Sequence, residues 1–282
     1  MNKPPHISLL GIPWDENSSF MRGSAGAPAL IRETLYSDST NLWTESGFDL
    51  GDTGIFDNLG DLPLSEPVDP HLITGAICEL ARKPTVPLCL GGDHAVSYPI
   101  VRGIHRVHGP VDLLQFDAHP DLWECFNENR FSNACPFARI MEENLAERLV
   151  QIGIRTANAH QRRQAARFHV EMIEMNGLSS CQSRLEFTLP LYISFDIDVL
   201  DPAFAPGVSH PEPGGLSTRE AVNLIRSVKA PSIAGIDVVE YNPVRDSREI
   251  TAYAAVKIIK ELSAQVLALK GIDPPSMLEM GE

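Results

Sequence analysis

The chain has 282 residues, of which 43% are apolar, and it carries a formal net charge of −14. This length and composition suffice to bury the core of one large α/β domain, so we expect a single domain over residues 1–282 with its core at about 6–269. The acidic excess argues against nucleic acid and anionic membranes as partners and favours a cationic substrate. Charge alone is weak support, since many proteins without such a substrate are also acidic.

Cysteine usage and the N-terminus bear on the cellular compartment. The five cysteines are odd in number and too far apart for a Cys-x-x-Cys unit: Cys78, Cys89, Cys125, Cys135 and Cys181. We expect them to be free thiols in a reducing cytoplasm. The first residues lack the apolar core of a signal peptide, and no run approaches the roughly 20 apolar residues that span a bilayer. These features predict a soluble, unexported protein.

Short apolar runs alternate along the chain with segments of helical spacing. In chain order, strands are expected at 7–12, 86–90, 111–116, 148–154, 189–197 and 232–239, and helices at 27–35, 71–82, 136–144, 159–168, 218–228 and 250–269. The nearly continuous apolarity of the runs indicates strands that are covered on both faces. The alternation predicts an α/β fold, a three-layer α-β-α sandwich around a mainly parallel sheet.

Several of the expected strands end in charged or metal-ligating side chains. These residues are His94 after the second strand, Asp117, His119 and Asp121 after the third, Asp196 and Asp198 in the fifth or just after it, and Glu240 after the sixth. Because the carboxyl ends of parallel strands meet at one edge of a sheet, we expect these groups to converge there. The loop at 201–215, with four prolines and three glycines in fifteen residues, is expected to be rigid and to lie over the same site.

A cluster of four aspartates and two histidines indicates a binuclear metal site. Carboxylates held within a few ångströms of one another repel strongly unless cations lie between them. Aspartate oxygens with a minority of imidazoles and no thiolate suit Mn²⁺ better than a structural zinc, and two ions about 3.5–4 Å apart can activate a shared water. The pattern therefore predicts a two-metal hydrolase.

Four motifs together resemble the ureohydrolase family of arginases and agmatinases. They are GGDH at 91–94, DAHPD at 117–121, SFDIDVLDPAFAPG at 194–207 and DVVEYNP at 237–243. The segments 10–20, 131–141 and 207–215 resemble most closely the plant-type arginases and their bacterial relatives. The resemblance spans nearly the whole chain and implies a single ureohydrolase domain with an arginase-like fold, in a homo-oligomer, either a trimer or a hexamer.

The resemblance also implies roles for individual residues. One Mn²⁺ would be held by His94, Asp117, Asp121 and Asp196, and a second by Asp117, His119, Asp196 and Asp198. Ni²⁺ or Co²⁺ could replace Mn²⁺. Asp121 would also relay a proton toward the leaving amine, and Glu240 would pair with a substrate guanidinium. Such a small cationic guanidino compound is poorly electrophilic, so its hydrolysis needs a strong nucleophile, an orienting carboxylate and a protonated leaving group.

Two positions depart from the family pattern or vary within it. Asn133 stands where family members usually carry a histidine that shuttles protons, and an amide cannot titrate near neutrality. The proton shuttle could have moved, the substrate could do without it, or activity could be lost or altered by design. His210 could take over part of the proton transfer or gate the pocket, with simple loop packing as the alternative. The remaining histidines at 105, 108, 160 and 169 are expected to face solvent.

We therefore expect hydrolysis of a guanidino compound to urea and an amine, with arginine or agmatine favoured. Alternatives are guanidinobutyrate, guanidinopropionate, hydroxyarginine or guanidine as substrate, or a catalytically silent metal-binding homologue. A deacetylase on a related fold is disfavoured, because such enzymes use a single-zinc pattern. The loop at 122–130 is expected to recognise the substrate tail through Trp123, Glu124, Asn127, Glu128 and Arg130, so that neither tail charge is excluded.

Overall fold

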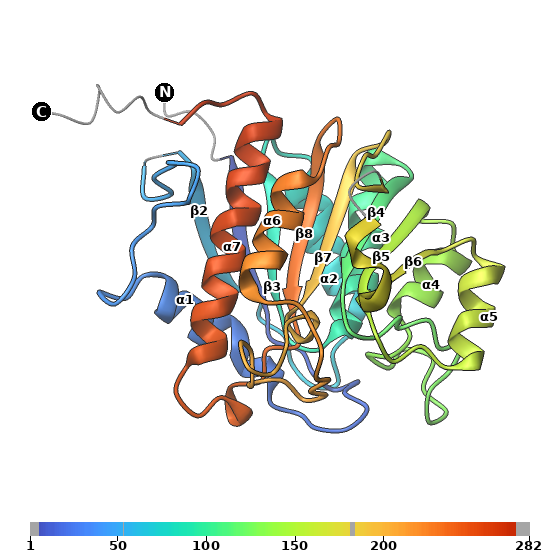
Figure 1. Ribbon diagram of the computed structural model, residues 1–282. Coiled ribbons are helices and arrows are strands. Elements are labelled where there is room, and N and C mark those ends of the chain that lie inside the picture. The colour runs from blue at the N-terminus through green and yellow to red at the C-terminus, as the bar shows by residue number, and fades with distance from the viewer. Residues whose placement is uncertain (1–5, 53, 181–183, 275–282) are drawn as a thin grey trace, which may run out of the picture.

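The computed structural model describes residues 6–52, 54–180 and 184–274, which form one sheet of eight strands (Figure 1). The strands are β1 (Ile7–Ile12), β2 (Phe56–Asp61), β3 (Val86–Gly91), β4 (Val111–Phe116), β5 (Ala146–Ile154), β6 (Glu171–Glu174), β7 (Leu191–Asp196) and β8 (Ile233–Val239). Their order across the sheet is β2-β1-β3-β8-β7-β4-β5-β6, and every pairing is parallel. The predicted parallel sheet is confirmed.

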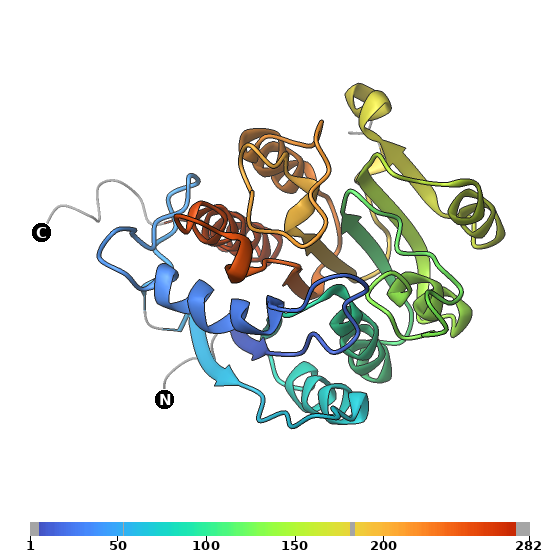
Figure 2. The ribbon, with the colours of Figure 1, turned by 90° about the horizontal axis from the view of Figure 1, so that it is seen from below.

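Helices cover both faces of this sheet, as the view from below in Figure 2 shows. They are α1 (Ala27–Leu35), α2 (Pro70–Ala81), α3 (Ser97–His108), α4 (Pro136–Glu142), α5 (Ala159–Arg167), α6 (Thr218–Ser227) and α7 (Ile250–Leu269). Helices α1, α6 and α7 lie on one face, and α2 and α3 lie on the other (Figures 1 and 2). This arrangement is the expected three-layer α-β-α sandwich.

Alternate side chains of each strand enter two separate cores. On β4, Leu114 packs into a core with Ile31 of α1 and Ile259 of α7, whereas Leu113 packs into a core with Ile104 of α3. All of these side chains are fully buried. Because successive side chains of a strand point to opposite faces, a strand covered on both sides must be apolar throughout, which explains the unbroken apolar runs.

Three elements were not predicted from the sequence. The strands β2 and β6 lie at the two edges of the sheet, where a half-exposed strand needs no apolar run; β2 reads FDNLGD and β6 reads EMIE. Helix α3 contains Pro99 and Gly103, which weaken a helical pattern. Pro99 lies in the first turn, where it removes no intrahelical hydrogen bond, and Gly103 packs where a Cβ atom would come within 2.9 Å of the Thr74 carbonyl oxygen.

The strand order places the chemically important strand ends side by side. Strands β3, β8, β7 and β4 are consecutive neighbours, and Phe116 of β4 is in register with Phe195 of β7. Just beyond β3, Gly92 passes so close to the loop after β1 that a Cβ atom would lie 2.0 Å from the Trp14 carbonyl oxygen. Only glycine fits there, and this close approach brings the following His94 over the sheet edge.

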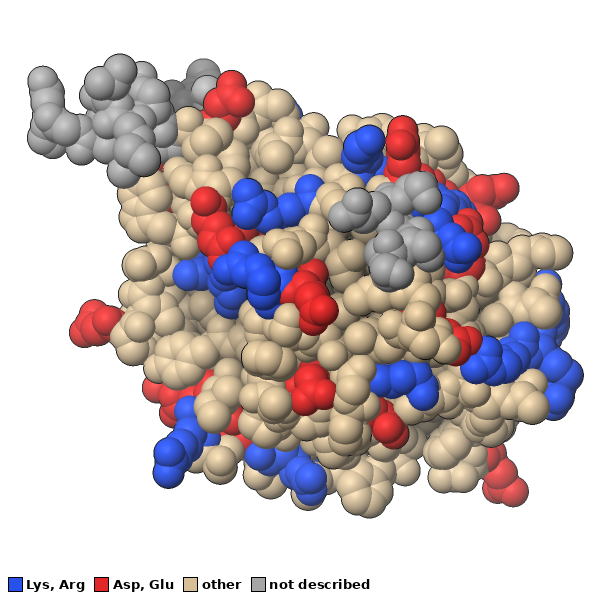
Figure 3. Space-filling view, viewed as in Figure 1, with Lys and Arg blue, Asp and Glu red and all other residues tan. Residues whose placement is uncertain are grey.

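Surface charge and thiols complete the description. On the face drawn in Figure 3 acidic and basic side chains are interspersed, so the acidic excess is not gathered into one patch there. Cys78, Cys89, Cys125 and Cys135 are free thiols, and Cys181 lies outside the described residues. Within the described ranges, none of the helices combines the length and the apolarity needed to span a membrane.

Candidate metal centre

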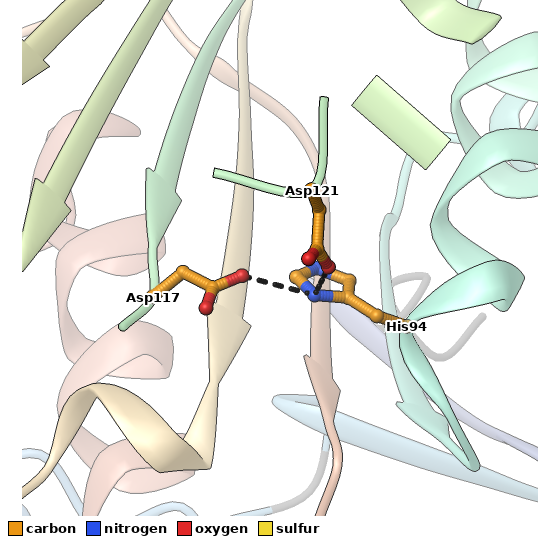
Figure 4. Close-up of side chains that lie close together, drawn as sticks. All are labelled: His94, Asp117 and Asp121. Carbon is orange, nitrogen blue, oxygen red and sulfur yellow. Dashed lines mark ion pairs between the residues drawn. The ribbon is translucent and has the colours of Figure 1, made fainter. Parts of the chain in front are cut away.

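His94 is fully buried among three carboxylates at the carboxyl edge of the sheet. Its Nδ1 atom lies 3.1 Å from Oδ2 of Asp117, 3.0 Å from Oδ2 of Asp121 and 3.2 Å from Oδ2 of Asp196. Figure 4 shows Asp117 and Asp121, both in the turn after β4, pointing at the imidazole of His94, which follows β3. Although it is buried, Nδ1 makes no hydrogen bond in this geometry. A buried nitrogen without a partner among converging oxygens fits a cation site.

His119 completes a second cluster that shares Asp117 with the first. Its Nδ1 atom lies 2.9 Å from Oδ2 of Asp198 and 3.5 Å from Oδ1 of Asp117. Asp117 therefore directs one oxygen toward each cluster, and both clusters could hold a metal ion. The donors are carboxylate oxygens and imidazole nitrogens, a set that suits Mn²⁺ and similar divalent ions. The structure thus brings together all six side chains predicted as ligands.

A chain of hydrogen bonds fixes the tautomer of His94. Its Nε2 atom lies 2.9 Å from Oγ of Ser194, and this hydroxyl donates a bond of 2.6 Å to Oδ1 of Asp237. The hydroxyl of Tyr192 donates to the other oxygen of Asp237. Because the hydroxyl of Ser194 donates its only hydrogen to Asp237, it can only accept a hydrogen bond from His94. Nε2 of His94 therefore carries the hydrogen, and the lone pair of Nδ1 faces the carboxylates.

Without cations the site is electrostatically frustrated. Burial and the neighbouring Asp198 and Asp117 raise the pKa of Asp196, and burial and Asp117 raise the pKa of Asp121 to about 7. Burial would also raise the pKa of Asp117, but the adjacent His119 and His94 hold it below its usual range. Such opposed shifts arise when several carboxylates share a small desolvated space. Divalent cations would remove the conflict.

The backbone is strained where the site is formed. Asp121 has φ of 49° and Glu240 has φ of 64°, both in the left-handed region that non-glycine residues rarely adopt. At the end of β7, Asp196 accepts a hydrogen bond of 2.7 Å from the backbone N–H of Asp198 and so turns the chain out of the strand. These turns let residues close in sequence face one site. Sparsely populated backbone conformations of this kind are typical of functional sites.

Glu240 is buried and held on one side only. Its Oε1 atom accepts a bond of 2.8 Å from the backbone N–H of His94 and one of 2.9 Å from Nδ2 of Asn133. Its Oε2 atom has no hydrogen-bond partner among the residues that the structure describes. The amide oxygen of Asn133 in turn accepts from the backbone N–H of Ser19 at 2.9 Å. Asn133 thus ties Glu240 to the loop after β1 and leaves one carboxylate oxygen free.

A cavity of about 200 Å³ opens directly onto both clusters. Its lining includes the acidic and ligating side chains His119, Asp121, Asp196, Asp198 and Glu240. The remaining lining residues, which we call the outer wall, carry no carboxylate: Ser19, Trp123, Phe126, Asn133, Ala134, Thr156, Asn158, Gln161 and His210. The carboxylates of the lining thus all belong to the two clusters or to Glu240.

His210 lies on this outer wall. Its Nε2 atom is 3.4 Å from Oγ of Ser19, and its ring contacts those of Phe20 and His119 at centroid distances of 5.7 and 5.9 Å. The loop that carries it is held in place, because Arg155 donates bonds to the carbonyls of Asp198 and Glu212. His210 itself is half-buried in the lining of the cavity.

Of the five side chains expected to recognise the substrate tail, only Trp123 lies in the lining of the cavity. Trp123 lines the cavity, but Glu124, Asn127, Glu128 and Arg130 are exposed and lie outside its lining. Arg130 instead pairs with Glu142 at 3.0 Å. These side chains point away because the loop folds back on itself through paired Phe126 and Asn129 backbone bonds.

Residues just after β5 were overlooked in the sequence. Thr156, Asn158 and Gln161 all line the cavity, and Asn158 and Gln161 also form the capping box that starts α5. The strand-end rule that located the ligands would have found them, because β5 is the neighbour of β4. His160 was expected to face solvent, but it is half-buried and stacks on Trp123 at a centroid distance of 4.8 Å.

A parallel α/β sandwich with two His/Asp clusters sharing one aspartate at the sheet edge is the structure of a binuclear metal-dependent protein. Residues 5–264 match the model of the Arginase family. Arginase 1, mitochondrial, of Arabidopsis thaliana is 46% identical over 92% of this chain and 80% of its own length. The chain belongs to the Arginase family, which depends on two metal ions.

Two further relatives show how far the similarity extends. The structure of arginase from Medicago truncatula superimposes with a TM-score of 0.88, is 44% identical, and covers 93% of this chain and 87% of its own. Guanidinopropionase of Pseudomonas aeruginosa is 34% identical over 91% of this chain and 85% of its own length. The fold and the family thus agree with the resemblance noted in the sequence.

The expected cytoplasmic location is contradicted by these relatives. The Arabidopsis protein and others of similar identity carry mitochondrial names, which point away from the cytoplasm. The expectation rested on free cysteines and on the first residues of the chain. Unpaired thiols indicate a reducing environment, and they do not distinguish one reducing compartment from another.

Proposed function

We propose that this protein is an amidinohydrolase that hydrolyses the guanidino group of arginine to urea and an amine. The observation that carries the proposal is the pair of His/Asp clusters sharing Asp117, with the free Oε2 atom of Glu240 on the same cavity. A planar cation on Glu240 would lie directly beside the metal positions. Family membership and the plant arginase relatives support the same reaction.

The metal ions we propose are two Mn²⁺ per chain, with Ni²⁺ or Co²⁺ as possible substitutes. The first would be held by His94, Asp117, Asp121 and Asp196. The second would be held by Asp117, His119, Asp196 and Asp198. When bound, such a pair lowers the pKa of a shared water and so provides a nucleophile at neutral pH. The carboxylate-rich donor set supports this choice over zinc.

Glu240 acts on the guanidinium of the substrate, and Asp121 acts on the leaving amine. Glu240 orients the guanidinium by accepting its N–H groups at Oε2, while the bonds from His94 and Asn133 keep the carboxylate in place. Asp121 moves a proton to the departing amine through Oδ1, because its Oδ2 atom faces His94. Protonation is required since a neutral amine leaves far more readily than an amide anion.

Asn133 and His210 serve the substrate rather than the metal ions. Asn133 holds Glu240 and the Ser19 loop together, and both ends of its amide are used in doing so. It therefore works as a neutral positioning group at a position where the resemblance to the family implies a histidine. His210 narrows the mouth of the cavity and contacts the bound substrate, as its half-buried place beside Ser19 and His119 supports.

The outer wall of the cavity favours arginine over agmatine. Agmatine ends in an ammonium group, yet the lining residues contribute carboxylates only from the metal clusters and from Glu240. Hydroxyl and amide groups of Thr156, Asn158 and Gln161 can bind the α-carboxylate and α-amino groups of arginine by hydrogen bonds. The same neutral groups could bind a carboxylate tail, so guanidinopropionate is the second candidate, supported by the relative named guanidinopropionase.

We also propose a single ureohydrolase domain over residues 1–282, with its core at about 6–269, in a homo-oligomer. The match of the family model to residues 5–264 supports one domain. The choice between a trimer and a hexamer rests on the resemblance to the family. Light scattering of the purified chain would decide between them.

The test is urea release from arginine, agmatine, guanidinobutyrate, guanidinopropionate, hydroxyarginine and guanidine after loading with Mn²⁺, Ni²⁺ or Co²⁺ in parallel. We expect the highest kcat/KM for arginine with Mn²⁺ and at least a tenfold lower value for agmatine. Faster turnover of agmatine would contradict the proposal that the outer wall favours arginine. Two bound ions per chain and no urea from any compound would indicate a silent homologue.

A further inference from the structure

Two glutamines lie side by side beneath the metal centre, and neither is a ligand. Gln115 of β4 and Gln151 of β5 are partners in the parallel ladder between these strands. Both side chains are fully buried, and on its other side Gln115 is in register with the buried Ser194 of β7. A buried primary amide is costly unless it is hydrogen-bonded, so a matched pair of them calls for a physical reason.

The two amides form a continuous chain of hydrogen bonds under the DAHPD turn. Nε2 of Gln115 donates to Oδ2 of Asp117 at 2.6 Å and to the carbonyl of His119 at 3.2 Å. Nε2 of Gln151 donates to Oε1 of Gln115 and to the carbonyl of Pro120, both at 2.6 Å. The pair therefore contacts the shared aspartate and two backbone carbonyls of the turn that carries three of the six ligand side chains.

The partners fix which way each amide points. The carbonyl of Pro120 can only accept, so Gln151 must direct its nitrogen toward it and toward Gln115. Oε1 of Gln115 accepts from that nitrogen, which leaves the Gln115 nitrogen facing Asp117. The orientation of Gln115 is thus imposed by Gln151 and by the carbonyl of His119, which can only accept, and Gln115 cannot flip without breaking three bonds.

The contact with Asp117 is specific to one carboxylate oxygen. Oδ2, which accepts from Gln115, is the oxygen that faces His94. Oδ1 accepts a bond of 2.6 Å from the backbone N–H of His119 and faces the other cluster. One donor on each oxygen fixes the plane of the carboxylate, so that each metal position receives one oxygen.

We propose that Gln115 and Gln151 are positioning residues that set the bridging orientation of Asp117, and that Gln115 governs the ion on the His94 side. This inference rests on the proposed metal centre and goes beyond it, because it assigns a metal-tuning role to two side chains that touch neither ion. Outer partners of metal ligands commonly control metal affinity by 10–100-fold, since they orient the ligand and adjust its charge.

The test is Mn²⁺ binding by equilibrium dialysis, without substrate, to the full chain and its variants. In Gln115→Leu we expect one of the two sites to lose about 10–100-fold in affinity, with the other site changing less. In Gln151→Leu the loss should be smaller, because Gln115 keeps its donor but loses the group that orients it. Electron paramagnetic resonance of bound Mn²⁺ should show a reduced dinuclear signal in both variants.

Gln265→Leu is the matched control. Gln265 is also buried and donates a bond of 2.7 Å to the carbonyl of Val228, and it lies on α7 outside the cavity lining. Its variant should bind both ions as the wild type does. If Gln115→Leu does not fold, Gln151→Leu carries the test alone.

Affinities within about twofold of wild type at both sites, in whichever of the two glutamine variants folds, would overturn the inference. So would an equal loss in Gln265→Leu, because any buried amide would then have the same effect. Because no substrate is present, failure of the proposed reaction is a separate result. A chain that binds two ions in a Gln115-dependent way but releases no urea would retain the inference and refute the proposed function.

Discussion

The side-chain nitrogen of Asn133 donates a hydrogen bond of 2.9 Å to Oε1 of Glu240, joining the loop after β4 to the end of β8. The two residues are more than a hundred positions apart in the chain. On its other end the amide of Asn133 accepts from the backbone N–H of Ser19. A neutral side chain thus holds the carboxylate that we expect to bind the substrate.

Asn133→Ala should lower kcat/KM for arginine about 10–100-fold, because a hydrogen bond to a charged group contributes about 1.5–3 kcal/mol. Asn133→Asp should be worse than alanine, since an ionised aspartate cannot donate and would repel Glu240. Asn223→Ala, at an exposed position of α6, is the control. Steady-state urea release measures all three. An aspartate variant as active as wild type would show that Asn133 does not hold Glu240.

His210→Ala should raise KM for arginine roughly tenfold and change kcat less, because we propose that His210, a lining residue of the cavity, contacts the substrate and binds no metal ion. His71→Ala, at the exposed start of α2, is the control and should leave both constants unchanged. If kcat of the His210 variant fell by several orders of magnitude while KM stayed constant, a binding role for this residue would be wrong.

Divalent ions should stabilise the fold, because they bind the native clusters and relieve carboxylate repulsion there. Adding Mn²⁺ to chelator-treated protein at about a thousand times Kd should raise Tm by roughly 5–15 °C, corresponding to about 4 kcal/mol. Asp198→Asn should lose much of this shift, while Asp57→Asn, on the exposed edge strand β2, should keep it. An undiminished shift in the Asp198 variant, measured by calorimetry, would place the ions elsewhere.

Glu45 should make stability depend on acid pH. Hydrogen bonds from Arg219 and Lys257 lower the pKa of Glu45 to about 2, against about 4.5 for the free side chain. A lowered pKa stabilises the native state fully above 4.5, and this contribution disappears as the pH falls toward 2. Glu45→Gln should therefore be less stable than wild type at pH 7, and the difference should shrink below pH 4.5.

Urea denaturation at several pH values tests this prediction. Glu33→Gln is the control, because Glu33 is exposed on α1 and makes no ion pair in the described part of the chain. The control should track wild type across the whole range. A stability difference between wild type and Glu45→Gln that grew as the pH was lowered would have the wrong sign for this network.

The parts of the structure that follow from local pattern were predictable from sequence. Strands that are buried on both faces are recognisable in the sequence as apolar runs. The residues that follow β3, β4, β7 and β8 lie close together, because these strands are neighbours in a parallel sheet. The polar edge strands β2 and β6 carry no such signal. Their places are set by pairing with β1 and β5 rather than by their own composition.

The supporting contacts of the site could not be predicted, because they depend on how distant segments approach. Gln115 and Gln151 sit within apolar runs and read as isolated polar residues until the register of β4 and β5 pairs them. In the sequence, Asn133 indicates only that a catalytic histidine is missing. Its hydrogen bonds with Glu240 and Ser19 become known only from the structure. Charge in the loop at 122–130 suggested tail recognition, yet most of its side chains point to solvent.

We propose that two metal ions and Glu240 act together to hydrolyse arginine, and the decisive experiment is a titration of urea release against bound Mn²⁺. Activity should rise until two ions are bound per chain, whereas Glu240→Gln should bind the same two ions and lose at least a hundredfold in kcat/KM, about 2.7 kcal/mol. Full activity with one ion would contradict the need for two ions. A Glu240→Gln variant as active as wild type would contradict the role of Glu240.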